Sequence, residues 1–308
     1  MRPRILVVGS MNMDLFMYGL NELPRWSEST FATEYGYAAG GKGANQALAI
    51  ARQGADCYML GRVGADDNGR TLLDSLERSG VHTDFVAVDP ELRTGMSTMN
   101  MGNDGRYFSI YVPGANTAMR VADLDAALKD SRFDMIVMQL EMPREMVRHI
   151  CALGRRTGMP VFLDAGPAMA FPLEALRGAF VISPNEAETR ALTGIAPDTD
   201  AGMAAAAEAI YRQARPGYVL LKLGERGAYL YSDGEQRLIP GYRVQAVDTT
   251  AAGDTFGAAF CVRRCQGAPV LEAIRYAHAA AAICVTRKGG HPSIPTAEET
   301  EAFLRENG

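Results

Sequence analysis

The chain has 308 residues, of which 47% are hydrophobic and 22% charged, and its formal net charge is −5. This composition is typical of a globular protein with one large α/β domain or two smaller ones. No block of Lys or Arg indicates a nucleic-acid or membrane surface, and no apolar run approaches a membrane span. The run 5–9 is too short for a signal peptide, and five dispersed cysteines fit free thiols, so we expect a cytoplasmic protein.

The first strand is predicted over Ile5 to Val8, a continuous apolar run of the kind found in buried parallel strands. Asn12 and Asp14 follow soon after it. Ligands of open α/β sheets bind at the carboxyl ends of the strands, which makes Asp14 a candidate ligand contact. The alternative role for Asp14 is that of a turn residue.

A glycine-rich segment follows over 36–46, and its spacing matches G-x-x-x-x-G-K. Gly43 stands where a P-loop needs Ser or Thr for Mg²⁺, and the preceding segment is not a clean strand, so we reject a P-loop. We expect a tight turn at 40–43 into a helix over 44–53. Lys42 and Asn45 then point toward a polar ligand, or Lys42 is simply a solvated residue at a helix start.

A separate small antiparallel sheet is expected from 16–31, 95–101 and 106–112. The last two segments flank Asn103-Asp104-Gly105, a hairpin signal, and no helical pattern lies between them. Such a sheet could cover the site as a lid or form an oligomer interface.

From Val121 the alternation of strands and helices resumes. Strands at 135–140, 161–163 and 181–183 end at Glu141, Asp164 and Asn185–Glu188, which brings polar groups to one edge of the sheet. Helices are expected at 124–128, 143–156, 200–214, 255–265, 270–285 and 297–305, and further strands at 56–63, 81–88, 218–223, 228–231 and 236–239. The predicted helix caps are Asp67 or Asn68, Asp200, and a capping box from Thr296 to Glu299.

The stretch from Asp248 to Asp254 reads as a loop of small residues that opens a buried helix. The first N–H groups of a helix lack internal partners, and the helix dipole adds positive potential, which together make an anion site. Asp254 in the first turn could accept a proton from an attacking hydroxyl. It could equally be an ordinary first-turn acid that stabilises the helix.

These stretches carry a family resemblance that covers essentially the whole chain. Gly40–Ala47 resembles the first signature of the PfkB-type carbohydrate kinases, also called the ribokinase family, and Asp248–Phe256 resembles the second. Gly61–Asp66 and Pro184–Glu188 also fit, in the expected order. The resemblance implies an α/β fold, a three-layer αβα Rossmann-type sandwich. It implies a single domain over 1–308 with a β-sheet lid formed by about 11–37 and 94–113.

The implied activity is transfer of the γ-phosphate of ATP to the 5-hydroxyl of D-ribose, because 243–249 and 273–289 resemble the ribose-phosphorylating members of the family. Alternatives are a kinase for another small sugar or a nucleoside (2-deoxyribose, fructose, adenosine) and a non-catalytic sugar-binding protein. An NAD enzyme is discounted because Val8–Met11 lacks G-x-G-x-x-G. The resemblance also implies ATP, Mg²⁺ and an activating K⁺ as cofactors, and a homodimer formed through the lid.

The same resemblance assigns roles to individual residues. Asp254 would be the base, and the amides of Ala251, Ala252 and Gly253, running on to Asp254, the anion hole. Sugar-binding positions are Asn12, Asp14, Gly40, Gly41, Lys42, Asn45, Glu141 and Asp254. ATP-binding positions are Asn185, Lys222, Leu223, Gly224, Glu225, Arg226, Gly227, Gly253 and His278. Asn185 and Glu188 would organise Mg²⁺ through water. The K⁺ positions are Asp248, Thr250, Cys284, Arg287, Gly289 and Ser293.

Four places depart from the pattern of the family. Lys222 stands where the ribose-phosphorylating members usually have Thr, and Ala251 replaces a Gly that is common in the wider family. Met13 is bulkier than expected between two sugar-binding positions, and Trp26–Ser29 departs from the usual turn of the lid. These departures bear on the identity of the sugar and on lid closure rather than on phosphoryl transfer.

Overall fold

The computed structural model describes residues 2–22, 24, 27–103 and 107–307. Trp26 of the expected lid turn, and Asp104 and Gly105 of the expected hairpin turn, lie outside these ranges. In the described chain, nine strands form the main sheet in the order β13-β12-β11-β10-β9-β8-β1-β4-β5. Strand β12 runs antiparallel to both of its neighbours, β11 and β13, and the other neighbouring pairs are parallel. The strands are β1 (Arg4–Val8), β4 (Asp56–Gly64), β5 (His82–Asp89), β8 (Met135–Met138), β9 (Val161–Asp164), β10 (Val181–Ser183), β11 (Tyr218–Lys222), β12 (Ala228–Ser232) and β13 (Glu235–Ile239).

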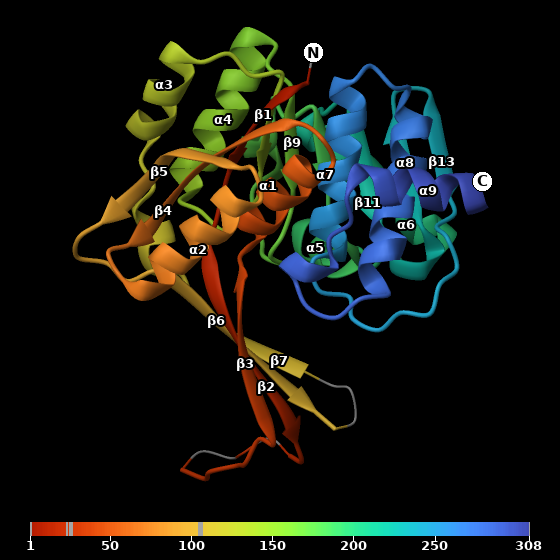
Figure 1. Ribbon diagram of the computed structural model, residues 1–308. Helices are drawn as coiled ribbons and strands as arrows, with labels where there is room; N and C mark the ends of the chain where they lie inside the picture. The colour runs from red at the N-terminus through yellow and green to blue at the C-terminus, as the bar shows by residue number, and fades with distance from the viewer. Residues whose placement is uncertain (1, 23, 25–26, 104–106, 308) are drawn as a thin grey trace.

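Helices cover both faces of this sheet, as Figure 1 shows. Side chains alternate between the faces of a strand, so Ile5 and Val7 join one core cluster while Leu6 and Val8 join the other. The predicted three-layer α/β architecture is therefore confirmed. The first cluster packs against α1 (Lys42–Arg52), α2 (Asp67–Arg78), α7 (Ala252–Cys265), α8 (Val270–Val285) and α9 (Ala297–Asn307), and the second against α3 (Val121–Asp130), α4 (Arg144–Thr157), α5 (Glu186–Thr193) and α6 (Asp200–Ala214). Short 3₁₀ turns lie at Gly114–Ala118, Leu173–Leu176, Gly224–Arg226 and His291–Ser293.

A second sheet of four strands projects away from the main body (Figure 1). Its order is β3 (Glu34–Gly40), β2 (Asn12–Leu20), β6 (Gly95–Gly102), β7 (Tyr107–Val112), and we call it the small sheet. It was expected to be antiparallel, but β2 and β6 are parallel partners. The reason is that β2 follows β1 and β6 follows β5, so both leave the main sheet at the carboxyl ends of parallel strands.

Two helix caps lie at least one residue earlier than predicted. The caps are Asp66, whose carboxylate accepts from the Gly69 amide at 2.9 Å, and Thr199, whose hydroxyl accepts from Gly202 at 3.1 Å. Asp67 and Asp200 are instead the first helical residues, and a cap needs the extended backbone that precedes them. The capping box between Thr296 and Glu299 is confirmed by both of its hydrogen bonds.

The parallel strands place their carboxyl ends at one edge of the main sheet. The small sheet leaves from this edge, and the residues that follow β8, β9 and β10 reach it too. Within the described ranges, no helix has both the length and the apolar character needed to cross a membrane.

The core between the sheet and α7 provides a stability test. Phe162 of β9 is fully buried, and its ring lies 5.9 Å from that of Phe260 of α7, centroid to centroid. We expect Phe162→Ala to lower the free energy of unfolding by about 3–5 kcal/mol, because it leaves a cavity as well as losing apolar burial. Leu92→Ala is the control, since Leu92 is 41% exposed; it should cost less than about 0.5 kcal/mol. Equal losses in urea titrations would contradict this packing.

Candidate active site

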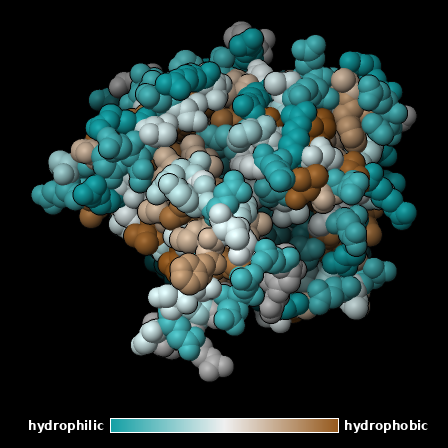
Figure 2. All heavy atoms as spheres, turned by 60° about the horizontal axis from the view of Figure 1, so that its bottom comes forward, coloured by the Kyte–Doolittle hydropathy of each residue, from teal (hydrophilic) through white to brown (hydrophobic). Residues whose placement is uncertain are grey.

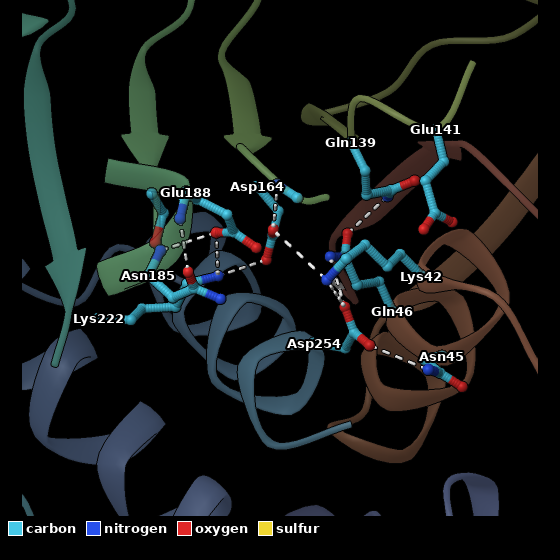
Figure 3. Close-up of polar contacts among 12 residues, drawn as sticks. Lys42, Asn45, Gln46, Gln139, Glu141, Asp164, Asn185, Glu188, Lys222 and Asp254 are labelled. Atoms are coloured by element: carbon cyan, nitrogen blue, oxygen red, sulfur yellow. Dashed lines mark hydrogen bonds and ion pairs between the residues drawn. The ribbon is translucent and has the colours of Figure 1, made fainter. Parts of the chain in front are cut away.

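Asp254 lies in the first turn of α7, is 5% exposed, and is held by two side chains of α1 (Figure 3). Asn45 Nδ2 donates to Oδ2 at 2.9 Å, and Gln46 Nε2 donates to Oδ1 at 3.1 Å. Both donors come from a helix that begins directly after Gly41, whose φ of +88° favours glycine. The two glycine-rich stretches, more than 200 residues apart, therefore meet and fix the carboxylate of Asp254 in one orientation.

Next to that carboxylate, backbone N–H groups at the start of α7 are left without hydrogen-bond acceptors in the described part of the chain. Ala252 N–H donates to Thr249 and Thr255 N–H to Ala251, whereas those of Gly253 and Asp254 reach no acceptor among the described residues. Ala251 reaches the helix through a left-handed conformation, φ +61°. Free amides at a helix start attract anions, because the helix dipole adds to their partial positive charges.

Lys42 lies between two buried carboxylates at the start of α1. Its Nζ is 3.9 Å from Asp254 Oδ1 and 4.0 Å from Asp164 Oδ1. Burial alone would lower the pKa of Lys42, but the carboxylates of Asp254 and Asp164 outweigh burial and hold this pKa above its ordinary value. Lys42 is therefore a fixed positive charge in the site.

Lys222, the last residue of β11, approaches Asp164 from the opposite side (Figure 3). Its Nζ lies 2.6 Å from Asp164 Oδ2 and 4.0 Å from Glu188 Oε2. Burial tends to raise the pKa of Asp164, but Lys222 and Lys42 outweigh it and hold this pKa below its usual range. Burial raises the pKa of Glu188. The edge of the sheet thus carries alternating charges rather than a cluster of one sign.

The sugar-binding positions predicted at the sheet edge are mostly buried and already hydrogen-bonded. Asn116 Nδ2 donates to Asn12 Oδ1 at 2.8 Å, and Ser97 Oγ donates to Asp14 Oδ1 at 2.6 Å. Burial raises the pKa of Asp14 to about 6. Burial also raises the pKa of Glu141, which accepts from Ser10 Oγ.

Three further positions bear on this part of the site. Asn45 Oδ1 is buried without a partner in the described chain, so it can accept a hydrogen bond from a hydroxyl group. A β-carbon on Gly40 would lie 2.0 Å from Asp14 Oδ2, so any other residue there would displace that carboxylate. Met13 does not enter the site, because its side chain points to the other face of β2 and is 4% exposed in the core.

The predicted ATP loop after β11 is only partly directed at the sheet edge. Arg226 donates away from it, to the carbonyls of Pro197 at 2.7 Å and Asp198 at 3.2 Å. Leu223 is buried, whereas Gly224 and Glu225 are exposed, and Gly227 adopts a φ of +100°. Burial lowers the pKa of His278 to about 4, which keeps its imidazole neutral at pH 7.

Asn185 and Glu188, the pair predicted to organise Mg²⁺, cap the N-terminal end of a helix. Asn185 Oδ1 accepts from Glu188 N–H at 2.9 Å, and Glu188 Oε2 accepts from Asn185 N–H at 2.7 Å, which is a capping box for α5. Asn185 Nδ2 and Glu188 Oε1 have no hydrogen-bond partner in the described chain, which leaves one donor and one acceptor free. Among the described residues, no group of three or more His, Cys, Asp or Glu side chains is arranged to hold a metal ion.

The predicted cation site is built around Asp248, just before α7. Its carboxylate accepts from the amides of Thr250 and Gly289, each at 2.9 Å, which joins two loops. Burial alone would raise the pKa of Asp248, but these hydrogen bonds outweigh burial and lower it. Cys284 Sγ lies 3.1 Å from Ser293 Oγ. The Arg287 guanidinium pairs with Glu299 at 2.6 Å, so this residue can offer the site only its backbone.

Some contacts at the site were not assigned from the sequence. Gln46 holds Asp254, and Gln139 Nε2 in turn donates to Gln46 Oε1 at 2.7 Å. Gln46 lies inside the glycine-rich segment, next to Asn45, and that position was its only signal. Asp164 was placed at the sheet edge by the strand pattern but was given no role.

The known proteins that are similar to this chain are carbohydrate kinases. Residues 2–297 match the model of the pfkB family of carbohydrate kinases. A ribokinase of Haemophilus influenzae is 34% identical to this chain over 307 residues, with 99% of each chain covered. A deoxyribokinase of Salmonella typhi is 33% identical, and the match covers 98% of this chain and 99% of the relative. The solved structure of Arabidopsis thaliana ribokinase complexed with ribose and ATP has a TM-score of 0.90 and 34% identity, with 99% of each chain covered. The chain belongs to the pfkB family of carbohydrate kinases.

Proposed function

We propose that this protein is an ATP-dependent kinase that phosphorylates the 5-hydroxyl of D-ribose to give ribose 5-phosphate. The observation that carries the proposal is the carboxylate of Asp254, fixed by Asn45 and Gln46 next to the free amides of Gly253 and Asp254. A base and an anion site share one helical turn there. Relatives named ribokinase, one of them solved with ribose and ATP, support this substrate pair.

In this mechanism Asp254 acts as the general base. The hydroxyl oxygen of the sugar attacks the γ-phosphorus, its proton passes to the carboxylate of Asp254, and the bond from phosphorus to the ADP oxygen breaks. The amides at the start of α7 stabilise negative charge on the transferred group, with Ala251 and Ala252 positioning Gly253. Asn45 and Gln46 keep the carboxylate in place throughout.

The sugar is held by the polar residues that line the start of β2 and α1. Asn12, Asp14, Lys42, Asn45 and Glu141 offer both donors and acceptors, which suits adjacent hydroxyls of a small polyol. Gly40 and Gly41 lie close against the sugar-binding residues and let the sugar approach the backbone. A β-carbon would collide with the Asp14 carboxylate if it stood on Gly40, and with the backbone at Asn12 if it stood on Gly41. The small sheet is the lid of this site, and 1–308 act as one domain.

ATP is bound at the loop after β11, by Lys222 to Gly227 with Asn185, Gly253 and His278. Mg²⁺ fits the residues present, because Asn185 Nδ2 and Glu188 Oε1 remain free to hold phosphate and metal-bound water. The metal would supply positive charge to the phosphates when bound. The capping box holds both side chains in position for it.

A monovalent cation, K⁺, binds at the carbonyl-rich loops joined by Asp248. Thr250, Cys284, Arg287, Gly289 and Ser293 contribute to this site, mostly through the backbone. The loop runs directly into the anion hole, so a bound cation would make that loop more rigid.

The runner-up function is a 2-deoxyribose kinase. It is favoured by one observation, the deoxyribokinase relative at 33% identity over nearly the full chain. The two sugars differ by the 2-hydroxyl, so the choice depends on whether a buried polar group is left unpaired when that hydroxyl is missing. We prefer D-ribose, since Asp14, Lys42, Asn45 and Glu141 together present many polar atoms to one small ligand.

The exposed side of the small sheet is the proposed homodimer interface. Leu15, Met17, Tyr35 and Tyr37 line a groove of about 290 Å³, and Tyr35 and Tyr37 are 70% and 62% exposed. Viewed from the lid side, apolar residues lie in patches among hydrophilic ones (Figure 2). Apolar surface of this kind favours association.

The five cysteines, all described, are free thiols, which supports a cytoplasmic location.

The base assignment is tested by Asp254→Asn, which keeps the shape of the side chain and removes the proton acceptor. We expect kcat to fall about 10²–10⁴-fold with sugar binding largely retained. Asp67→Asn is the matched control, because Asp67 is also a first-turn helix acid but is exposed and remote. Equal and small effects of the two changes would mean that Asp254 only stabilises its helix.

The cation site is tested by replacing K⁺ with Na⁺ in the assay. We expect kcat to be several-fold higher in K⁺, and Asp248→Asn to remove most of that difference, because its single side-chain oxygen cannot accept from both the Thr250 and Gly289 amides. Equal rates for the wild-type protein in the two salts would contradict the K⁺ assignment.

The dimer is tested by light scattering after size-exclusion chromatography. We expect a mass of twice the 33.2 kDa chain, and a monomer for Tyr37→Asp, which places a charge in the groove. Val88→Asp, at a 53% exposed position of β5, should remain dimeric. A monomeric wild-type protein at assay concentration would exclude this interface.

A further inference from the structure

Lys222 places an ammonium group at the edge of the anion site. Its side chain is 12% exposed, and its Nζ contacts Asp164 Oδ2 at 2.6 Å. On the opposite side, a β-carbon built on Gly253 would lie 3.5 Å from the same Nζ. The ammonium therefore lies between a buried carboxylate and the start of α7, which carries the free amides of Gly253 and Asp254.

The chain uses lysine sparingly, which makes this position unusual. It has four lysines against 27 arginines, and two of the four, Lys42 and Lys222, converge on the site. Arginine suits fixed, bidentate pairs, whereas lysine carries a compact charge on a flexible stem that can change partners. Lys129 and Lys288 are exposed.

Asp164 does not depend on Lys222 alone. Its Oδ1 accepts from the Gly166 amide at 3.0 Å and lies 4.0 Å from Lys42 Nζ. By contrast, the two amides of α7 have no acceptor in the described chain. An anion bound to those amides would lie close to the ammonium of Lys222. A small rotation of the Lys222 side chain would then move the ammonium from the carboxylate of Asp164 to that anion.

We infer that Lys222 is a catalytic residue that leaves Asp164 for the transferred phosphoryl group when nucleotide binds. The inference rests on the proposed kinase function and adds a protein-borne positive charge to it. Lys222 takes no part in the proton transfer: the new bond forms from the sugar oxygen to phosphorus, the bond to ADP breaks, and the sugar proton goes to Asp254. The ammonium stabilises the negative charge on the phosphoryl oxygens during this exchange.

The kinetic test compares Lys222→Met with Lys129→Met, an exposed control on α3. We expect Lys222→Met to lower kcat about 10²–10³-fold, the usual cost of one such stabilising group, with KM for the sugar unchanged. Lys222→Arg should recover part of the loss. Wild-type kcat in Lys222→Met would overturn the inference.

A binding test separates contact with phosphate from simple neutralisation of Asp164. Affinities for β,γ-methylene-ATP and AMP are measured without Mg²⁺ in Asp164→Asn and in the Asp164→Asn/Lys222→Met double variant. Removing this carboxylate leaves Lys222 only the more distant Glu188, at 4.0 Å, so a lysine that merely neutralises Asp164 predicts equal affinities. We expect the double variant to bind the ATP analogue at least tenfold more weakly and AMP equally well. Equal binding of the analogue would overturn the inference.

An NMR measurement tests the contact between Lys222 and phosphate independently of kinase activity. With only four lysines, isotopic labelling of their ε-carbons gives four NMR signals, and Lys222→Met identifies one of them. That signal should shift when β,γ-methylene-ATP is added, and those of Lys129 and Lys288 should not. If this shift occurs but the wild-type protein phosphorylates no sugar, the proposed function fails while the phosphate contact stands. An active enzyme whose Lys222 signal does not respond refutes the contact alone.

Discussion

The contact between α1 and the first turn of α7 is the interaction on which the site depends. Asn45 and Gln46 reach Asp254 across 209 and 208 residues of sequence, and both hydrogen bonds are buried. A buried carboxylate without partners would be costly, so the two amides stabilise the fold as well as the geometry of the base. Gln139 extends the network to the end of β8 by holding Gln46. This network of hydrogen bonds joins the end of β8, the two helices and the candidate base.

Charge alternation is the second constraint. Lys42 and Lys222 flank Asp164, and Asp254 and Glu188 lie beyond them (Figure 3). Removing one member of a buried ion network leaves its partner uncompensated, and this loss typically costs several kcal/mol. The arrangement therefore holds positive charge close to the anion site before any phosphate arrives, which reduces the reorganisation needed during transfer.

Much of this was predictable from local sequence patterns. Apolar runs ending in polar residues located β1, β8, β9 and β10 and the edge where the site lies, because parallel strands share the direction of their carboxyl ends. The small-residue stretch before Asp254 predicted a helix start with free amides, and the structure has both. The P-loop spacing at 36–42 was rejected on Gly43 and on the irregular segment before it, and the structure has a small-sheet strand there followed by a helix.

Other features depended on tertiary structure. The parallel pairing of β2 with β6 follows from where both strands leave the main sheet, and no local pattern encodes it. Met13 looked like an obstacle to the sugar until its strand placed it on the opposite face. Arg226 and Arg287 matched binding positions in sequence, yet their guanidinium groups pair with distant residues. Position in a motif fixes the backbone, whereas the direction of a long side chain depends on neighbours far along the chain.

The most direct test of the account is a comparison of kcat/KM for D-ribose, 2-deoxy-D-ribose, D-fructose and adenosine, with ATP as the phosphate donor. The polar residues around Asp254 predict D-ribose as the best substrate. They also predict a lower value for 2-deoxy-D-ribose, because the missing hydroxyl leaves a buried polar group unpaired. A higher kcat/KM for any of the other three would contradict the account, and transfer to none of them would contradict the kinase assignment itself.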